Sequence, residues 1–312
     1  MKVFYRYVLK SAWQTIWKLK FLWFFGAFAA LTANGEEYDI IIRNFDTVKN
    51  IEEKLQSLKS ALNEGIISTA WQNLINYFTN NVFSSLLIIF AALLIVIAFI
   101  YLITVSQTAI IKATARFRKN ELFVFFDGFV VGTKYFWPIL VLNLFAKIII
   151  YGTLVVFGVP LTLIYISSDN FFWLATFSLI AFLALIPLNI FISFIVKYAS
   201  IYIILKDFQV RPAIKSALKL FYKNWLITLE NAFLLYAINF IITFFLVGSL
   251  TFAGLPFTAT GYLVFLGIVV FIGAIIASFQ FSAWTYIFIE ISENRGVAKL
   301  IRLFKREKEA VK

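Results

Sequence analysis

Long apolar stretches separated by short polar loops dominate the chain. A helix needs about 20 apolar residues to cross about 30 Å of hydrocarbon. We expect a span in each of the stretches 16–33, 82–111, 137–166, 171–205, 225–252 and 260–289. The pattern predicts an all-α fold, a polytopic transmembrane helical bundle of about six spans, which forms a single membrane domain over residues 1–312.

The first stretch has the weakest pattern. Several basic residues precede or begin it, and only the part from Phe21 onward is free of charge. A cleavable signal peptide has the same order of features, so a retained span and a cleaved leader both stay open. Trp13 and Trp17 at helical spacing favour retention, and Lys18 and Lys20 can extend toward the headgroups and so lengthen a short span.

Charge alternates from one loop to the next. The segments 1–20, 112–134, 206–223 and 295–312 are basic, whereas 34–81, the turn near residue 168 and the turn 254–260 are not. Basic loops stay in the cytoplasm. We therefore expect a multi-pass protein of the cell membrane, of the bacterial inner-membrane type, with both termini cytoplasmic and the segment 34–81 outside.

Composition narrows the chemistry. The chain is 62% hydrophobic and 14% charged, whereas soluble domains are about a quarter charged. It contains no Cys and no His, which removes zinc sites, thiol nucleophiles, haem ligation by either residue and disulfides. We expect no metal, no cofactor and no catalytic residues. The net charge of +12 lies beside the apolar stretches, so it indicates anionic lipid headgroups as partners and not nucleic acid.

A basic amphipathic segment, 211–223, precedes the fifth stretch. Its apolar residues share one helical face, its lysines point away from that face, and Pro212 suits a first turn. This predicts an interfacial helix on the cytoplasmic side. The candidate headgroup contacts are Arg211, Lys215, Lys219 and Lys223.

Similar basic segments, 121–134 and 297–305, are weaker copies. A Lys two or three residues before a Trp recurs at Trp23, Trp137 and Trp225. Either the chain repeats a unit of one interfacial helix and one helical hairpin three times, or every inner membrane boundary has this composition.

Residues 211–225 (RPAIKSALKLFYKNW) carry a family resemblance. They resemble the Ala-Leu-rich cytoplasmic helix of a bacterial superfamily that includes the membrane domain of glycerophosphoryl diester phosphodiesterases and several uncharacterised six-span families. The likeness in span plan covers most of the chain. In that family the hydrolase is a separate soluble domain, for which this chain has no room. The resemblance therefore implies the architecture and a bacterial envelope, without the hydrolase activity.

The segment 34–81 contains one amphipathic pattern. Apolar residues recur at spacings of three and four between Val48 and Leu62, which predicts a helix. Residues 44–65 then either dock a protein partner or pack on the outer mouth of the bundle or on the outer leaflet.

Ionisable residues inside a span are costly and indicate function. Lys147, Lys197 and Glu230 fall within the expected spans, in their cytoplasmic halves, and Asn143 lies one helical turn from Lys147. The same half carries further amides at Asn231, Asn239, Gln107 and Gln280. One interpretation is a polar cavity in which Glu230 pairs with Lys197 or Lys147. The other is that both lysines extend to the phosphates and that Glu230 lies among the headgroups.

These patterns favour a non-enzymatic envelope scaffold or accessory protein that acts through its basic helices. The alternatives are a transporter or channel for a small solute, with a cavity lined by Lys147, Lys197 and Glu230, and a lipid-modifying enzyme. No catalytic constellation and no phosphate-cradling Gly loop is found in the sequence. The balance leans away from an enzyme and leaves that question open.

Overall fold

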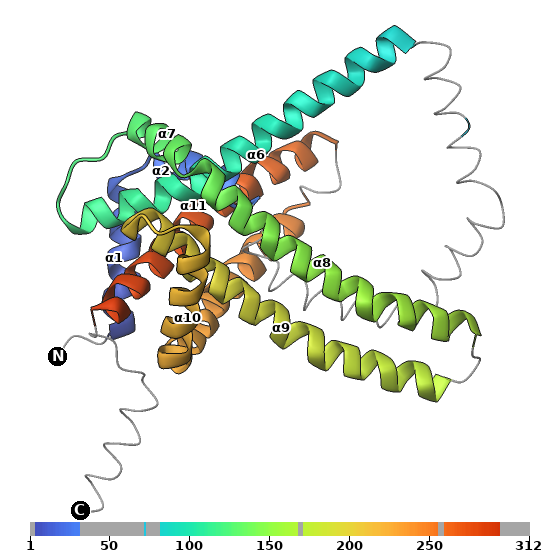
Figure 1. Ribbon diagram of the computed structural model, residues 1–312. Helices are drawn as coiled ribbons and strands as arrows, with labels where there is room; N and C mark the ends of the chain where they lie inside the picture. Colours follow the sequence, from blue (N-terminus) through green and yellow to red (C-terminus); the bar gives the residue numbers. More distant parts are fainter. Residues whose placement is uncertain (1–3, 32–71, 73–81, 168–170, 255–258, 294–312) are drawn as a thin grey trace, which may run out of the picture.

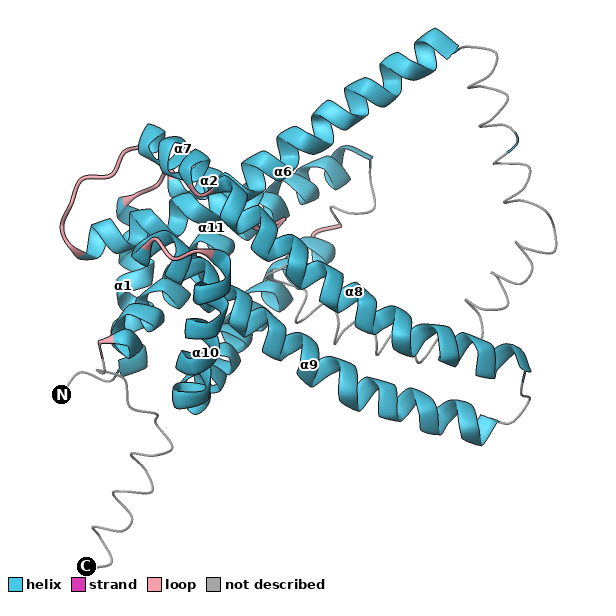
Figure 2. Ribbon diagram, viewed as in Figure 1, coloured by secondary structure: helices cyan, strands magenta, loops and turns pink. Residues whose placement is uncertain are grey.

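The computed structural model describes residues 4–31, 72, 82–167, 171–254 and 259–293. Figure 1 and Figure 2 show that this part of the chain consists of helices and connecting loops, which confirms the all-α expectation. The helices are α1 (Phe4–Lys18), α2 (Leu22–Ala29), α6 (Val82–Arg118), α7 (Phe125–Lys134), α8 (Phe136–Ser167), α9 (Phe171–Lys206), α10 (Val210–Phe252) and α11 (Ala259–Ser292).

Five helices of the described chain are long and apolar enough to cross a membrane, so the chain is a multi-pass membrane protein. They are α6, α8, α9, α10 and α11. Four of them, α6, α8, α9 and α11, begin within one residue of the start of an apolar stretch in the sequence. The segment 34–81, with its expected helix at 44–65, lies outside the described residues except for Gln72.

The first apolar stretch is divided in the structure. Helix α1 ends at Lys18 and the eight-residue α2 begins at Leu22. Between them the backbone tightens into bonds that span three residues, from the Leu22 N–H to the Leu19 carbonyl and from the Trp23 N–H to the Lys20 carbonyl. Helix α2 is shorter than a span needs, so the sixth span stays a prediction.

Three amphipathic helical segments lead into apolar helices through short breaks. The first break is the turn at 19–21, and the second is Tyr135, with φ −100° and ψ 8°, between α7 and α8. The third is Asn224 inside α10, with φ −132° and ψ 29°. Each break lies one to four residues before one of the three Trp residues, at the place where the Lys–aromatic pattern recurs.

The second and third amphipathic segments each pack on the helix that precedes them in the chain. The first segment, α1, packs on the last helix, α11. Helix α7 lies on α6, and α1 lies on α11. The first part of α10 lies on α9, where the Phe221 ring is 5.2 Å from that of Phe191. Small residues allow this approach. A Cβ on Gly132 of α7 would lie 2.5 Å from the Val105 side chain of α6.

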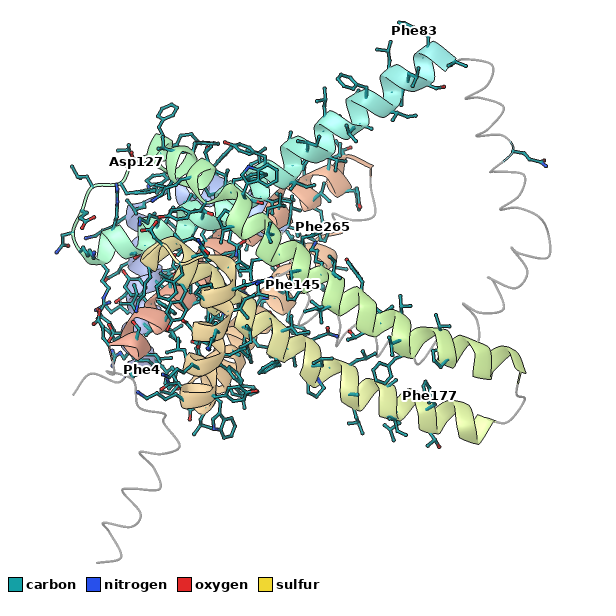
Figure 3. All side chains as sticks on the ribbon, in the orientation of Figure 1. Phe4, Phe83, Asp127, Phe145, Phe177 and Phe265 are labelled. Carbon is teal, nitrogen blue, oxygen red and sulfur yellow. The ribbon has the colours of Figure 1, made fainter. Side chains whose placement is uncertain are left out.

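The packed core lies where the C-terminal halves of α6, α9 and α11 meet. Ile110, Ile201 and Ile287, one from each helix, are all buried. Away from this core the helices separate. Figure 1 shows the first half of α6 standing apart from the antiparallel pair α8 and α9, and Figure 3 shows Phe83 on that free end. Residues of this half expose apolar side chains of the kind that lipid covers.

Ion pairs fasten the helices at the core end. Arg118, at the end of α6, contacts Glu290 in the last turn of α11 at 2.7 Å and Glu293, the residue after that helix, at 3.0 Å. Asp207 follows α9 in a left-handed conformation with φ +54°. It accepts hydrogen bonds from Lys134, at 2.9 Å, and from the Tyr135 hydroxyl. The junction between α7 and α8 is thereby held to the junction between α9 and α10.

Candidate functional site

A cavity of about 240 Å³ lies between α6, α8 and α9, with Leu31 at one edge. Helix α8 contributes a single face at spacings of three and four, which includes Asn143, Leu144 and Lys147. Most of the wall is aliphatic. The polar and charged side chains in it are Thr104, Gln107, Asn143, Lys147, Ser193 and Lys197.

The two lysines occupy different parts of this cavity. Lys197 is buried, with 8% of its surface exposed, and its Nζ lies 5.0 Å from the centre of the Trp284 ring on α11. A cation over an indole face is attracted by the ring quadrupole. Lys147 is exposed. Its neighbours Leu144 of α8 and Ile100 of α6 are exposed too, so the cavity opens sideways between these two helices.

A chain of amides and a hydroxyl crosses the cavity wall. Asn143 Nδ2 donates to Gln107 Oε1 at 3.2 Å, and Gln107 Nε2 donates to Ser200 Oγ at 3.2 Å. The Ser200 hydroxyl in turn donates to the Val196 carbonyl at 2.8 Å. This chain fixes the Gln107 amide between α8 and α9, because both of its ends are engaged.

A second, much smaller chamber adjoins the cavity at the centre of the core. It has a volume of about 10 Å³, which is room for about one water molecule. Three helices each supply one polar residue to its lining, namely Gln107 of α6, Lys197 of α9 and Gln280 of α11. The residue one turn after each of them lines the chamber as well, so the three helices meet here in the same register.

The structure brings some of the predicted polar residues together and separates others. Asn143, Lys147 and Lys197 line one cavity, whereas its lining, as far as the described residues define it, leaves out Glu230 and Asn231. Glu230 lies against α1 instead, where the Tyr5 hydroxyl donates to its carboxylate. Its pairing with a lysine stays a prediction.

Asn231 is fully buried on α10. Its Oδ1 and Nδ2 atoms have no hydrogen-bond partner among the described residues. A buried amide without partners costs about 1–3 kcal/mol, so this site is a local weakness of the bundle.

Sequence reasoning missed Ser193, which lines the cavity, and also Ser200 and Trp284, which contact the cavity residues Gln107 and Lys197. Ser200 and Ser193 gave no signal, because a Ser inside an apolar helix is ordinarily satisfied by its own backbone. Trp284 gave none either, because a Trp near a span end is expected at any membrane boundary. Only the crossing of α9 and α11 places its ring over Lys197.

The predicted headgroup contacts lie on the outer face of α10. Arg211, Lys215, Lys219 and Lys223 are all exposed. On the opposite face Ala213 and Ala217 are fully buried. This is the arrangement that the amphipathic pattern predicted for the helix, and its contact with lipid stays a prediction. The segment 297–305 lies outside the described residues.

No group of three His, Cys, Asp or Glu side chains within the described ranges is placed to hold a metal ion. Comparison with protein-family models, with curated proteins and with solved structures finds no match to this chain. The resemblance to the phosphodiesterase membrane domain therefore stays a prediction.

Proposed function

We propose that the protein binds a small anionic solute within the membrane and carries it, with the cavity between α6, α8 and α9 as the binding site. The observation that supports this is that Lys147 and Lys197, from two different helices, line one cavity. Two like charges on one cavity repel each other, and an anion between them replaces repulsion by attraction. Asn143 donates one amide N–H to Gln107, and its other N–H adds a hydrogen bond for the oxygens of the anion.

The size of the cavity limits the ligand. Pockets for drug-sized molecules run from about 300 to 1,000 Å³, and this one holds about 240 Å³. It suits a carboxylate or phosphate group with a short substituent. The aliphatic wall excludes water from most of the surface and strengthens the interaction with the lysines, because charge interactions are stronger at low dielectric.

A carrier needs a closed side, and the core provides one. The cavity meets the small chamber at Gln107 and Lys197, and Gln280 on the far wall of that chamber also lines a groove between α1, α10 and α11. A chamber the size of one water cannot pass an anion. Passage requires the Trp284 ring to leave Lys197 and α11 to move relative to α9.

The same proposal includes an orientation. We place six spans in a bacterial inner membrane, with both termini and the exposed lysines of α10 in the cytoplasm on anionic lipid. The alternation of basic loops supports this plan. A scaffold that acts through those helices is the alternative, and a bundle with no cavity at the lysines would have favoured it.

The experiment is anion-dependent stabilisation of the purified chain. A ligand that binds only the folded state at 100 times its dissociation constant raises the free energy of unfolding by about 2.7 kcal/mol. We expect inorganic phosphate, acetate or chloride, titrated at constant ionic strength, to raise the melting temperature of the wild type. The Lys197→Gln and Lys147→Gln variants should lose this shift.

The matched control is Lys215→Gln, which removes the same charge from the exposed face of α10 and should keep the shift. Uptake of the stabilising anion into proteoliposomes then tests transport. An equal shift in all four proteins, or none in the wild type with any of the three anions, would contradict the proposal.

A further inference from the structure

A groove with a volume of about 890 Å³ lies between α1, α10 and α11. Two aliphatic walls face each other along it. Leu234, Ile238 and Ile242 follow one another at one-turn spacing on α10, opposite Ile272 and Ile276 of α11. The lining extends from 234 to 242 on α10 and from 272 to 280 on α11, a rise of about 12 Å along each helix. One leaflet contributes about 15 Å of hydrocarbon, so the groove nearly matches the depth of a leaflet.

Helix α1 crosses the end of this groove, and Figure 1 shows it beside the core end of α11. Tyr5 reaches Glu230 of α10, and Trp13 contacts Phe279 of α11 with ring centres 6.0 Å apart. Thr15 meets the hydroxyl of Tyr286 at 3.0 Å. The helix is therefore fixed across both walls rather than parallel to them.

One stripe of α1 lines the groove at spacings of four, three and four residues. It consists of two cations followed by two indoles: Arg6, Lys10, Trp13 and Trp17. The indoles are partly exposed, at 47% and 43%, and their rings are 5.6 Å apart. Indoles with one apolar and one wet side are typical of the headgroup level. The polar end of the groove therefore lies at the membrane surface and its aliphatic end lies in the hydrocarbon.

Arg6 and Lys10 are exposed and one helical turn apart. Neither forms an ion pair with any acidic residue that the structure describes. Two neighbouring cations at the mouth of an apolar groove complement one phosphate attached to a hydrocarbon chain. Arg binds phosphate oxygens in a bidentate manner, and Lys adds a point charge.

We propose that this groove is a binding site for an anionic phospholipid. Its phosphate contacts Arg6 and Lys10, its glycerol region lies against the two indoles, and one acyl chain lies between α10 and α11. Asn239 and Gln280, which also line the groove, lie deeper than the cations. The site is separate from the cavity with Lys147, since the small central chamber lies between the two.

The test is native mass spectrometry of the full chain in detergent, with added phosphatidylglycerol or phosphatidylethanolamine of identical acyl chains. A basic residue near the surface is worth about a factor of five in affinity for anionic lipid, so two give roughly a 30-fold preference. We expect wild type to retain phosphatidylglycerol at least tenfold better. The Arg6→Gln/Lys10→Gln variant should retain both lipids equally.

Two further variants separate this site from general surface attraction. Lys215→Gln/Lys219→Gln removes the same charge from the exposed face of α10 and should keep the wild-type preference. Ile238→Trp fills the aliphatic end and leaves the cations in place, and it should lower retention at least tenfold. Soluble glycerol phosphate in excess should not displace the lipid, because it has no acyl chain to occupy the groove. Circular dichroism of each variant verifies folding.

The proposal is overturned if phosphatidylglycerol is retained no better than phosphatidylethanolamine, or if the two double variants behave alike. Retention of phosphatidylglycerol by Ile238→Trp equal to that of wild type would also overturn the proposal, since the acyl chain would then lie outside the groove. A lipid preference that persists while no anion stabilises the Lys197 cavity would refute the proposed function and leave this site intact.

Discussion

Replacing Gly26 by Ala should destabilise the bundle strongly, because α2 meets α11 there without room for a methyl group. A Cβ on Gly26 would lie 2.1 Å from the carbonyl oxygen of Ala274 and 2.2 Å from Ser278 Oγ. The carbonyl belongs to the helix backbone, so the two helices must separate. Separation also weakens the hydrogen bond from the Ser278 hydroxyl to the Leu22 carbonyl, which is 2.8 Å long.

The magnitude follows from three contributions. Overpacking of this severity costs about 3 kcal/mol, and a hydrogen bond between membrane helices contributes about 0.6 kcal/mol. Ala gains about 1 kcal/mol over Gly in a helix. The free energy of unfolding should therefore fall by about 2–3 kcal/mol.

The assay is reversible unfolding in mixed micelles, with Gly267→Ala on α11 and Gly152→Ala on α8 as controls. A Cβ at either control position meets nothing within 4 Å, so both should be neutral or stabilising by up to about 1 kcal/mol. If Gly26→Ala matches the controls, α2 does not pack on α11. Removal of residues 1–31 as a leader would also make Gly26→Ala match the controls. The intact mass of the purified protein distinguishes the two explanations.

Three other substitutions test separate contacts. Hydrogen bonds from Tyr135, the larger contribution, and from Lys134 lower the pKa of the Asp207 carboxyl. Their stabilisation of the fold is present above about pH 4, the ordinary pKa of the group. It is lost as the pH falls through the lowered pKa of the folded state. Asp207→Asn, which tolerates the left-handed backbone, should cost no more than about 1 kcal/mol at pH 7, because the pair is exposed. The cost should be smaller at pH 3, and an equal cost at both pH values would contradict this. Glu290→Gln should lower the free energy of thermal unfolding by about 1–2 kcal/mol, because it removes a buried partner of Arg118. Glu293→Gln should cost less, and Arg118 keeps one partner in either variant. A larger loss for Glu293→Gln than for Glu290→Gln would contradict this prediction. Asn231→Leu should leave stability unchanged or raise it by about 1 kcal/mol, since a buried amide without partners is removed, whereas a clear loss would mean that the amide holds a ligand or water.

The long helices were predictable because length and uniform apolarity determine them locally. A helix in lipid satisfies its own backbone groups, so the starts of α6, α8, α9 and α11 follow from where the apolar stretches begin, whereas α6 continues past its stretch as far as Arg118. The breaks at Tyr135 and Asn224 were signalled as well, because each lies where an amphipathic segment changes into an apolar one. An amphipathic helix packs with one face only and an apolar helix is covered on all sides, so the helix axis changes direction where one becomes the other.

The turn between α1 and α2 was not predicted, although its cause lies in the sequence. An apolar stretch that begins at Ile16 places Lys18 and Lys20 inside a span. In the structure α1 belongs to the amphipathic segment and ends at Lys18, and the apolar helix begins at Leu22. The charged residues Lys18 and Lys20 lie at the end of α1 and in the turn after it, and the apolar helix that follows contains no charge.

The partner of Glu230 could not be derived from sequence, because it depends on how α1 crosses α10. Tyr5 is 225 positions away along the chain, and no periodicity connects the two residues. Depth within a span is readable from sequence, and the direction in which a side chain points around the bundle is not. For the same reason Lys147 and Asn143 were correctly placed on one face of α8, while the cavity that this face meets required α6 and α9.

The central chamber explains why Lys197 is the residue that sets the chemistry. Gln107, Lys197 and Gln280 occupy matching places on α6, α9 and α11, each followed one turn later by another lining residue, Ile111, Ile201 or Trp284. Two of these places carry a neutral amide and one carries a charge. Two of the three matching positions already hold Gln, so a Gln side chain should also fit at position 197. The Lys197→Gln variant should therefore fold, although it loses the charge. Lys197 is the one cation among the three polar residues that line this chamber, so the proposed anion site depends on it.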